Sequence, residues 1–150
     1  MKSGLRHRMV SAGSVDMHLV EAGPEDGQPV LLLHGFPEFW YGWRHQIPAL
    51  AQAGLRVLAP DARGYNRSSR PGAIADYRLK QLRADVVNLL DALDLPQAIV
   101  VGHDWGAALA WSVALYQPER VKRLAILNVP HPAVMSRMVR SNPRQLLRSW

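Results

Sequence analysis

The sequence predicts an α/β fold in which a mostly parallel sheet lies between helices and follows an N-terminal antiparallel hairpin. Two patterns support this prediction. Short apolar runs alternate along the chain with segments whose apolar residues recur at helical period. The runs in the middle of the chain are apolar throughout, as strands covered on both faces are. The length of 150 residues fits one domain.

Each element follows from a local pattern. Alternation around Gly13-Ser14 predicts the hairpin, and the apolar run Val30–Leu33 predicts a strand buried on both faces. The clearest helix covers Tyr77–Leu95, where leucines and a valine form one stripe, and we expect Pro96 to end it. The expected order is strands over 9–12, 15–20 and 30–33, a helix over 43–53, a strand over 56–59, the helix over 77–95, a strand over 98–101, a helix over 107–116 and a strand over 124–127.

Composition excludes several classes of protein. Hydrophobic residues make up 48% and charged residues 20%, which is typical of a globular domain rather than a disordered chain. Cysteine is absent, so a disulfide framework, a thiolate nucleophile and a cysteine-ligated zinc site are excluded. No apolar run approaches the length of a membrane span, and no signal-peptide core opens the chain. We therefore expect a cytoplasmic protein without a membrane span.

The net charge of +6 is unevenly distributed. Residues 1–119 hold 11 basic and 12 acidic residues, whereas residues 120–150 hold seven basic residues and no acid. Nucleic-acid binding needs a basic surface together with an element that reads or stacks on bases, and no such element is recognisable. Neither a G-x-G-x-x-G pattern nor a P-loop follows a predicted strand, so dinucleotide binding is not expected either.

The functional site is expected where loops leave the carboxyl ends of the parallel strands. Four loops do so: His34–Trp40, Asp61–Ser68, Gly102–Gly106 and Asn128–Pro132. In the second loop we expect Asp61 and Arg63 to tie the backbone together by hydrogen bonds. Asn66 is expected to occupy a left-handed turn position.

The loop Gly102–Gly106 carries the strongest chemical signal. It reads Gly-His-Asp-Trp-Gly between a strand and a helix, which is the spacing of a nucleophile elbow. Glycine at both flanks suits a turn in which side chains would collide with the neighbouring strand and helix. The central residue is Asp104 instead of the usual serine. Because a helix N-terminus and hydrogen bonds favour the charged form, we expect Asp104 to be ionised at neutral pH.

An aspartate nucleophile favours a particular reaction. A carboxylate transfers acyl groups poorly, but it can open a strained or activated saturated carbon and leave an alkyl ester on the enzyme. Water then attacks the ester carbonyl, so negative charge develops on the aspartate itself and two backbone N–H groups are needed beside it. The expected donors are Trp105, which follows the nucleophile, and Phe36 in the loop after an earlier strand.

At this point the chain resembles the epoxide hydrolases of the α/β-hydrolase fold. The resemblance implies hydrolysis of a small apolar epoxide to a vicinal diol through an ester on Asp104, with water as co-substrate and no metal or cofactor. It also implies a cis bond before Pro37 and supporting roles for His34, Gly35, Gly102, His103 and Gly106. The four matching motifs occur in the family's order: His34-Gly-Phe-Pro-Glu-Phe-Trp40, Asp61-x-Arg-Gly-Tyr-Asn-x-Ser68, Gly102-His-Asp-Trp-Gly106 and Asn128-Val-Pro-His-Pro132.

The resemblance also implies that parts of the enzyme have no counterpart in this chain. The family places its general-base histidine, the orienting acid and two lid tyrosines beyond the sixth strand. We therefore expect residues 1–130 to be the N-terminal part of the core, truncated after about the sixth strand, and residues 131–150 to begin the lid. Such a chain is expected to be alkylated once without turnover, and its strand at 124–127 would be an open edge that can self-associate.

No histidine of the chain is expected to replace the missing base. His131 is the best placed, yet a structural loop role is expected for it because a base must reach the attacking water. His34 and His103 are expected to point into the fold as hydrogen-bonded groups. The remaining three are expected at the surface or in packing: His7, His18 and His45.

Two alternatives stay open at the level of sequence. Haloalkane dehalogenases share the Asp104-Trp105 pair, but the Phe36 side chain offers no N–H to a departing halide, which favours the epoxide. A non-catalytic ligand-binding module is the second alternative, and the missing base supports it. The particular epoxide, its stereochemistry and the oligomeric state are not determined by these residues.

Overall fold

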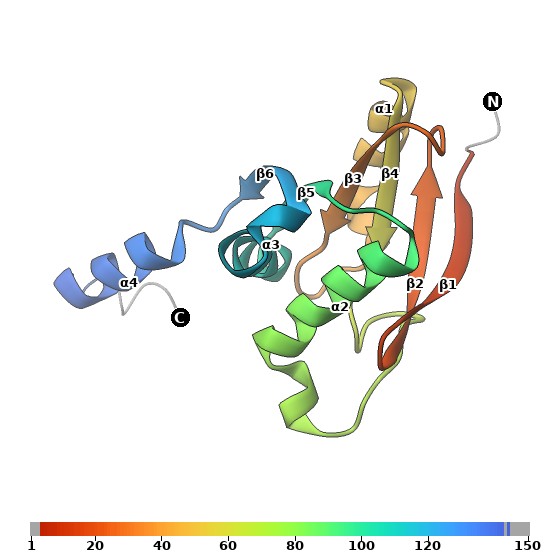
Figure 1. Cartoon of the computed structure of the whole chain (residues 1–150). Coiled ribbons are helices and arrows are strands. Elements are labelled where there is room, and N and C mark those ends of the chain that lie inside the picture. Colours follow the sequence, from red (N-terminus) through yellow and green to blue (C-terminus); the bar gives the residue numbers. More distant parts are fainter. Residues whose placement is uncertain (1–3, 143, 145–150) are drawn as a thin grey trace.

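The sheet is mostly parallel, as the sequence predicts, and its strand order is β1-β2-β4-β3-β5-β6 (Figure 1). The structure is a computed structural model that describes residues 4–142 and 144. The hairpin strands pair antiparallel with each other, and β2 pairs antiparallel with β4, whereas the other neighbours are parallel. The strands are β1 (Arg6–Ala12), β2 (Val15–Ala22), β3 (Gln28–Leu33), β4 (Leu55–Pro60), β5 (Ala98–His103) and β6 (Val121–Leu127).

Helices cover both faces of this sheet. Helix α1 (Gln46–Gln52) packs on one face, and α2 (Leu79–Ala92) and α3 (Trp105–Tyr116) pack on the other (Figure 1). Successive residues of β3 divide between the two cores: Leu31 and Leu33 are buried with α2 and α3, while Val30 and Leu32 are buried with α1. The continuous apolar run of β3 therefore serves both faces, which confirms the prediction of a doubly covered strand.

The helix expected over residues 43–53 is in fact two elements. A 3₁₀ turn, η1 (Trp40–Trp43), is followed by α1, which begins only at Gln46. Pro48 explains the break. A helix that began at residue 43 would place the proline ring in its interior, whereas α1 places it in the first turn, where no backbone N–H is needed.

The helix expected over residues 77–95 is shorter at both ends. The 3₁₀ turn η2 (Ile74–Tyr77) precedes it, and the extended backbone of Arg78, with ψ 146°, separates the turn from α2. Helix α2 ends at Ala92, before Pro96, because Asp94 adopts a left-handed conformation with φ 54°. The N–H of Leu95 then bonds to the carbonyl of Leu90 at 2.9 Å. The helix is therefore ended by this turn and not by Pro96.

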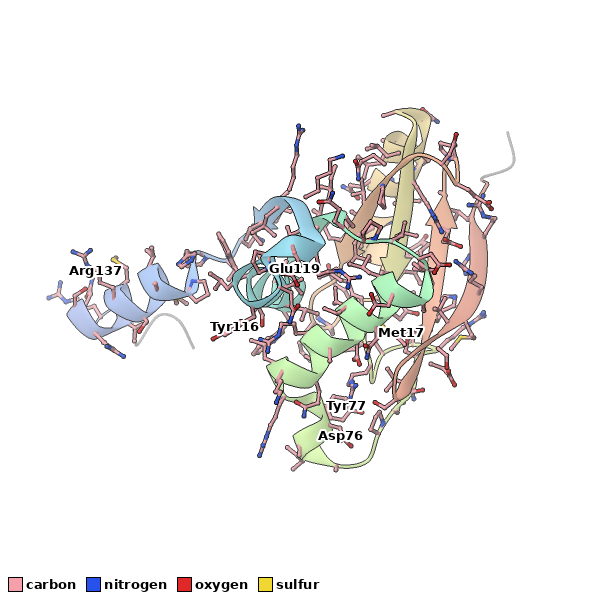
Figure 2. The ribbon with its side chains drawn as sticks, in the orientation of Figure 1. Met17, Asp76, Tyr77, Tyr116, Glu119 and Arg137 are labelled. Atoms are coloured by element: carbon pink, nitrogen blue, oxygen red, sulfur yellow. The ribbon has the colours of Figure 1, made fainter. Side chains whose placement is uncertain are left out.

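The last elements extend away from the sheet. A short turn, η3 (Pro118–Arg120), leads into β6, which pairs only with β5 among the strands of the described chain and so forms an edge, as predicted. Helix α4 (Pro132–Ser141), which carries Arg137, lies apart from the sheet (Figure 2). Residue 143 and residues 145–150 of the expected lid segment lie outside the described residues. Within residues 4–142, no helix has the length and hydropathy needed to cross a bilayer.

Candidate active site

The four loops that the sequence singled out meet at one edge of the sheet. Hydrogen bonds join them in pairs. The N–H of Phe36 bonds to Asp104 at 2.9 Å, and the N–H of Ala62 bonds to His34 Nε2 at 2.9 Å. The side-chain amide of Asn128 lies 3.1 Å from His103 Nε2. The carboxyl ends of β3, β4, β5 and β6 thus contribute to a single region, as the topology of parallel strands requires.

The turn at Asp104 has the geometry of a nucleophile elbow. Asp104 lies between β5 and α3 with φ 54° and ψ −122°, a conformation that is strained for any residue with a side chain. The flanking glycines are required sterically. A Cβ at Gly102 would lie 2.4 Å from the carbonyl oxygen of Gly106, and a Cβ at Gly106 would lie 2.1 Å from that of Leu33. Close packing of β3, β5 and α3 therefore holds the turn in place.

Substitution of Gly102 by alanine is expected to destabilise the fold by about 1–3 kcal/mol, because the added methyl group meets backbone that cannot move aside. Urea unfolding followed by circular dichroism measures the change. Gly72→Ala is the matched control, since a Cβ there meets nothing within 4 Å and the variant should keep the wild-type stability within a few tenths of a kcal/mol. Equal stability of the two variants would contradict the close packing.

Backbone amides hold the Asp104 carboxyl group in its charged form. Oδ2 accepts the 2.9 Å hydrogen bond from Phe36, and hydrogen bonding from the amides of Phe36 and then Trp105 lowers the pKa of Asp104. Burial acts in the opposite direction, and nearby His103 lowers the pKa further. The Phe36–Pro37 peptide is cis, as the resemblance implied.

The lowered pKa has a measurable consequence. A carboxyl group whose pKa is depressed by folding stabilises the native state above its unfolded-state pKa, and that contribution is lost as the pH falls through the folded-state pKa. Titration of the Asp104 carboxyl carbon by ¹³C NMR should therefore give a pKa below the ordinary value of 3.8, and the carboxylate should remain ionised throughout the mildly acidic range. A pKa at or above 3.8 would show that the amides do not contact the carboxylate in solution.

The histidines near the motifs are engaged by their neighbours. His34 is buried, its Nδ1 lies 2.9 Å from the carbonyl of Gly35, and burial lowers its pKa, so it is neutral and structural as predicted. His103 is half-exposed rather than pointing into the fold, because Glu38 and Asn128 hold its two ring nitrogens. His131 caps α4 through Nδ1 at 3.2 Å, which is the loop role that the sequence suggested.

Asp61 is a buried hydrogen-bond centre whose extent the sequence did not reveal. Its carboxylate contacts His18 Nδ1 at 2.6 Å, the N–H of Trp40 at 2.9 Å and the side-chain amide of Asn66 at 2.7 Å. The expected loop-tying role of Asp61 and the left-handed conformation of Asn66, with φ 43°, are confirmed. The partnership with the fully buried His18 was missed because 43 residues separate the two and no local spacing signals it.

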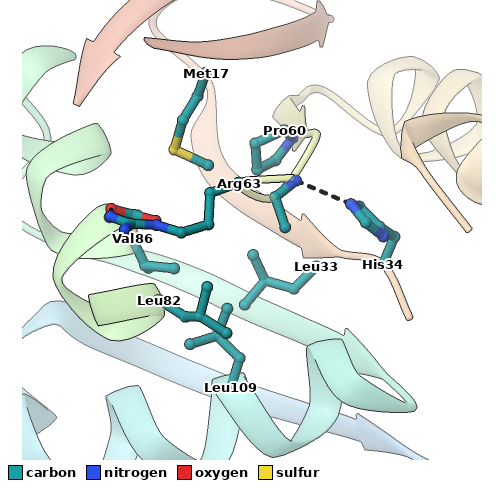
Figure 3. Close-up of a pocket in the computed structure, with 10 residues that line it drawn as sticks. Met17, Leu33, His34, Pro60, Arg63, Leu82, Val86 and Leu109 are labelled. Carbon is teal, nitrogen blue, oxygen red and sulfur yellow. Dashed lines mark hydrogen bonds and ion pairs between the residues drawn. The ribbon is translucent and has the colours of Figure 1, made fainter. Parts of the chain in front are cut away.

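A cavity of about 250 Å³ opens beside the elbow. Trp105 and Gly106 form one side of it, and loop and helix residues form the rest. A much smaller pocket of about 20 Å³ shares Leu82 and Leu109 with this cavity, and Figure 3 shows Leu33, Leu82 and Leu109 facing one another. Across the described part of the chain, no group of three or more histidine and acidic side chains is placed to hold a metal ion.

Comparison with known proteins identifies the family. Residues 28–150 match the model of the alpha/beta hydrolase fold. The chain is 47% identical over 146 residues to the AB hydrolase superfamily protein YfhM of Bacillus subtilis, covering 97% of this chain and 51% of that protein. It is 54% identical over 124 residues to epoxide hydrolase A of Mycobacterium tuberculosis, covering 82% of this chain and 38% of the relative.

Solved structures give the same result. The epoxide hydrolase VrEH1 of Vigna radiata superposes with a TM-score of 0.82 at 45% identity, over 85% of this chain and 41% of that one. Epoxide hydrolase A of Mycobacterium thermoresistibile superposes with a TM-score of 0.81 at 50% identity, over 84% and 40% of the two chains. The chain thus spans about half or less of the length of these relatives. On its sheet topology, its elbow and these matches, the chain belongs to the α/β hydrolase fold family.

Proposed function

We propose that this chain carries the nucleophile of an epoxide hydrolase and that Asp104 is that nucleophile. The observation that supports the proposal most strongly is the Asp104 carboxylate on a strained elbow, bonded at 2.9 Å to the N–H of Phe36. The relatives named as epoxide hydrolases share about half of its residues over the matched region. A carboxylate in this position suits attack on a strained saturated carbon.

In the first step, an oxygen of Asp104 forms a bond to a ring carbon of the epoxide. The bond from that carbon to the ring oxygen breaks, and the electron pair stays on the oxygen, which takes a proton from water. Oδ2 is held by Phe36, so Oδ1 is the oxygen free to attack. The product is a β-hydroxyalkyl ester of Asp104, with the amides of Phe36 and Trp105 beside the ester carbonyl.

In the second step, water adds to the ester carbonyl, and the two amides stabilise the resulting oxyanion before the diol leaves and the carboxylate is restored. Gly35 allows this arrangement, since a Cβ there would lie 2.5 Å from the Cβ of Asp104. The water also needs a general base. His34 and His103 use both ring nitrogens, and His131 is held at the start of α4 through Nδ1. We therefore expect the ester to accumulate on these 150 residues faster than it is hydrolysed.

Intact-mass analysis of the 150-residue chain after incubation with styrene oxide tests the proposal. The expected spectrum shows one added equivalent of the epoxide, with no steady release of phenylethanediol. Steady diol production would show that a general base is present, and it would leave the assignment of Asp104 as the nucleophile intact. An unchanged protein mass with no diol would overturn the proposed reaction and favour the non-catalytic module.

The haloalkane alternative is weaker at this site. Phe36 is 65% exposed and its side chain carries no donor, so it cannot assist the Trp105 indole in binding a departing halide. If the chain released bromide from 1-bromobutane faster than it was labelled by styrene oxide, the haloalkane reaction would be preferred instead. We also propose that residues 1–130 are the first part of the hydrolase core and that α4 lies in the first part of the lid.

A further inference from the structure

A second group of hydrogen-bonded polar side chains involves the hairpin β1–β2 and includes no residue of the elbow (Figure 1). Its members are Asp61, which follows β4, His18 in β2 and His7 in β1. The Asp61 carboxylate lies 2.6 Å from Nδ1 of His18, and Nε2 of His18 lies 3.1 Å from Nδ1 of His7. Asp61 and His18 are buried, whereas His7 is exposed. A carboxylate and two imidazoles thus form a chain of hydrogen bonds from the core to the surface.

The hydrogen-bond partners determine where the protons of this chain lie. The Asp61 carboxylate accepts hydrogen bonds and cannot donate them, so Nδ1 of His18 donates to it. Nε2 of a neutral His18 is then an acceptor, and Nδ1 of His7 donates to it. Within residues 4–142 the ring of His7 makes its hydrogen bond through Nδ1, which leaves the lone pair on Nε2.

This arrangement suits His7 to nucleophilic attack at neutral pH. Partial desolvation by its neighbours lowers the pKa of His7 below the ordinary value of 6.5, His18 and Arg67 lower it further, and Asp61 acts in the opposite direction. The ring is therefore mostly uncharged and keeps its lone pair. When Nε2 bonds to an electrophile, the Nδ1 proton becomes acidic and has a place to go, because Asp61 stabilises the imidazolium of His18.

Trp40 places an aromatic side chain beside the same imidazole. Its ring lies edge-on to His7 with the ring centres 5.2 Å apart, and its backbone N–H donates to the other oxygen of Asp61 at 2.9 Å. An aromatic neighbour favours electrophiles that carry an aromatic group. Imidazole also takes acyl groups, whereas a carboxylate such as Asp104 takes them poorly.

We propose that His7 is a second nucleophile of this chain and that it accepts acyl groups from small aryl esters, with His18 and Asp61 as positioning residues. Nε2 of His7 forms a bond to the acyl carbon, and the aryl oxide leaves with the electron pair of the broken C–O bond. The Nδ1 proton moves to Nε2 of His18. Water then adds to the acyl carbon, and the C–N bond breaks as His18 returns its proton to Nδ1. The carboxylic acid leaves, and the second proton of the water passes to solvent.

Hydrolysis of p-nitrophenyl acetate by the chain at neutral pH, followed through the release of nitrophenolate, tests this proposal. His7→Gln should lower the rate above the uncatalysed reaction by on the order of 10-fold or more, because it removes the nucleophile. His45→Gln is the matched control. His45 is also exposed, but it lies at the start of α1 and makes no capping hydrogen bond, so its loss should leave the rate unchanged.

Diethyl pyrocarbonate, which acylates neutral imidazoles, gives a second measurement that needs no variant. Peptide mapping of the wild-type chain should show His7 modified several times faster than His45. His18→Asn should then bring His7 to the rate of His45 without changing His45 itself. Asparagine can still donate to Asp61, but it is too short to accept the proton of His7. Circular dichroism checks that this variant folds.

The outcomes decide the proposal without reference to Asp104, on which it does not depend. Faster modification of His7, together with a loss of ester hydrolysis confined to His7→Gln, would support it. Equal modification of His7 and His45 in the wild-type chain, or equal losses in the two glutamine variants, would overturn it.

Discussion

Asp104→Asn is expected to lower epoxide labelling by on the order of 10³-fold or more, to the level of the unreacted protein. The amide has nearly the same shape as the carboxylate but carries no charge and is a very weak nucleophile. Asparagine has a side chain of almost the same size as aspartate and meets the same backbone strain at φ 54° and ψ −122°, so the elbow should fold. Intact mass after incubation with styrene oxide measures the loss, and circular dichroism checks the fold.

Asp94→Asn is a matched control for this experiment. Asp94 is an exposed aspartate whose φ is also 54°, but it lies at the end of α2 and not in the elbow. Its variant should label at the wild-type rate. If Asp104→Asn still acquired the epoxide at a comparable rate, another side chain would be the nucleophile and the assignment of Asp104 would be wrong.

The second large effect concerns the ion pair that joins the Asp61–Ser68 loop to α2. Arg63 Nε lies 2.6 Å from Asp85 Oδ2, and both side chains are only 4% exposed. Arg63→Met leaves the Asp85 carboxylate buried without its partner, which should cost about 3–5 kcal/mol of unfolding free energy. Chemical denaturation of the variant measures the loss.

Two further variants make the result specific to the buried pair. The double variant Arg63→Met/Asp85→Leu should recover most of the stability, because neither charge is then buried. Arg120→Met breaks a pair whose partner Asp91 is 59% exposed, and it should cost less than about 1 kcal/mol. A cost below about 1 kcal/mol for Arg63→Met would show that water reaches Asp85 in solution.

Local patterns predicted the parts of the molecule that depend on short stretches of chain. The strand run Val30–Leu33, the elbow at Asp104 and the left-handed Asn66 are each encoded within a few residues, and the structure has all three. The predicted helix over 43–53 is longer than the observed one, because the apolar pattern continues across Pro48 and does not show that its ring restricts where a helix can begin.

Contacts between distant residues could not be predicted in the same way. The buried pairs His18–Asp61 and Arg63–Asp85 join different strands, loops and helices, and their partners are 43 and 22 residues apart. Such contacts depend on the sheet topology, which a pattern of apolar residues does not specify in detail.

Peptide mapping of the labelled chain tests the central role of Asp104 most directly. After reaction with styrene oxide, tandem mass spectrometry of the peptide that contains residues 102–106 should place the added mass on Asp104. Hydroxylamine should remove it, because the bond is an ester. A hydroxylamine-stable adduct on a histidine or lysine, with Asp104 unmodified, would contradict the account.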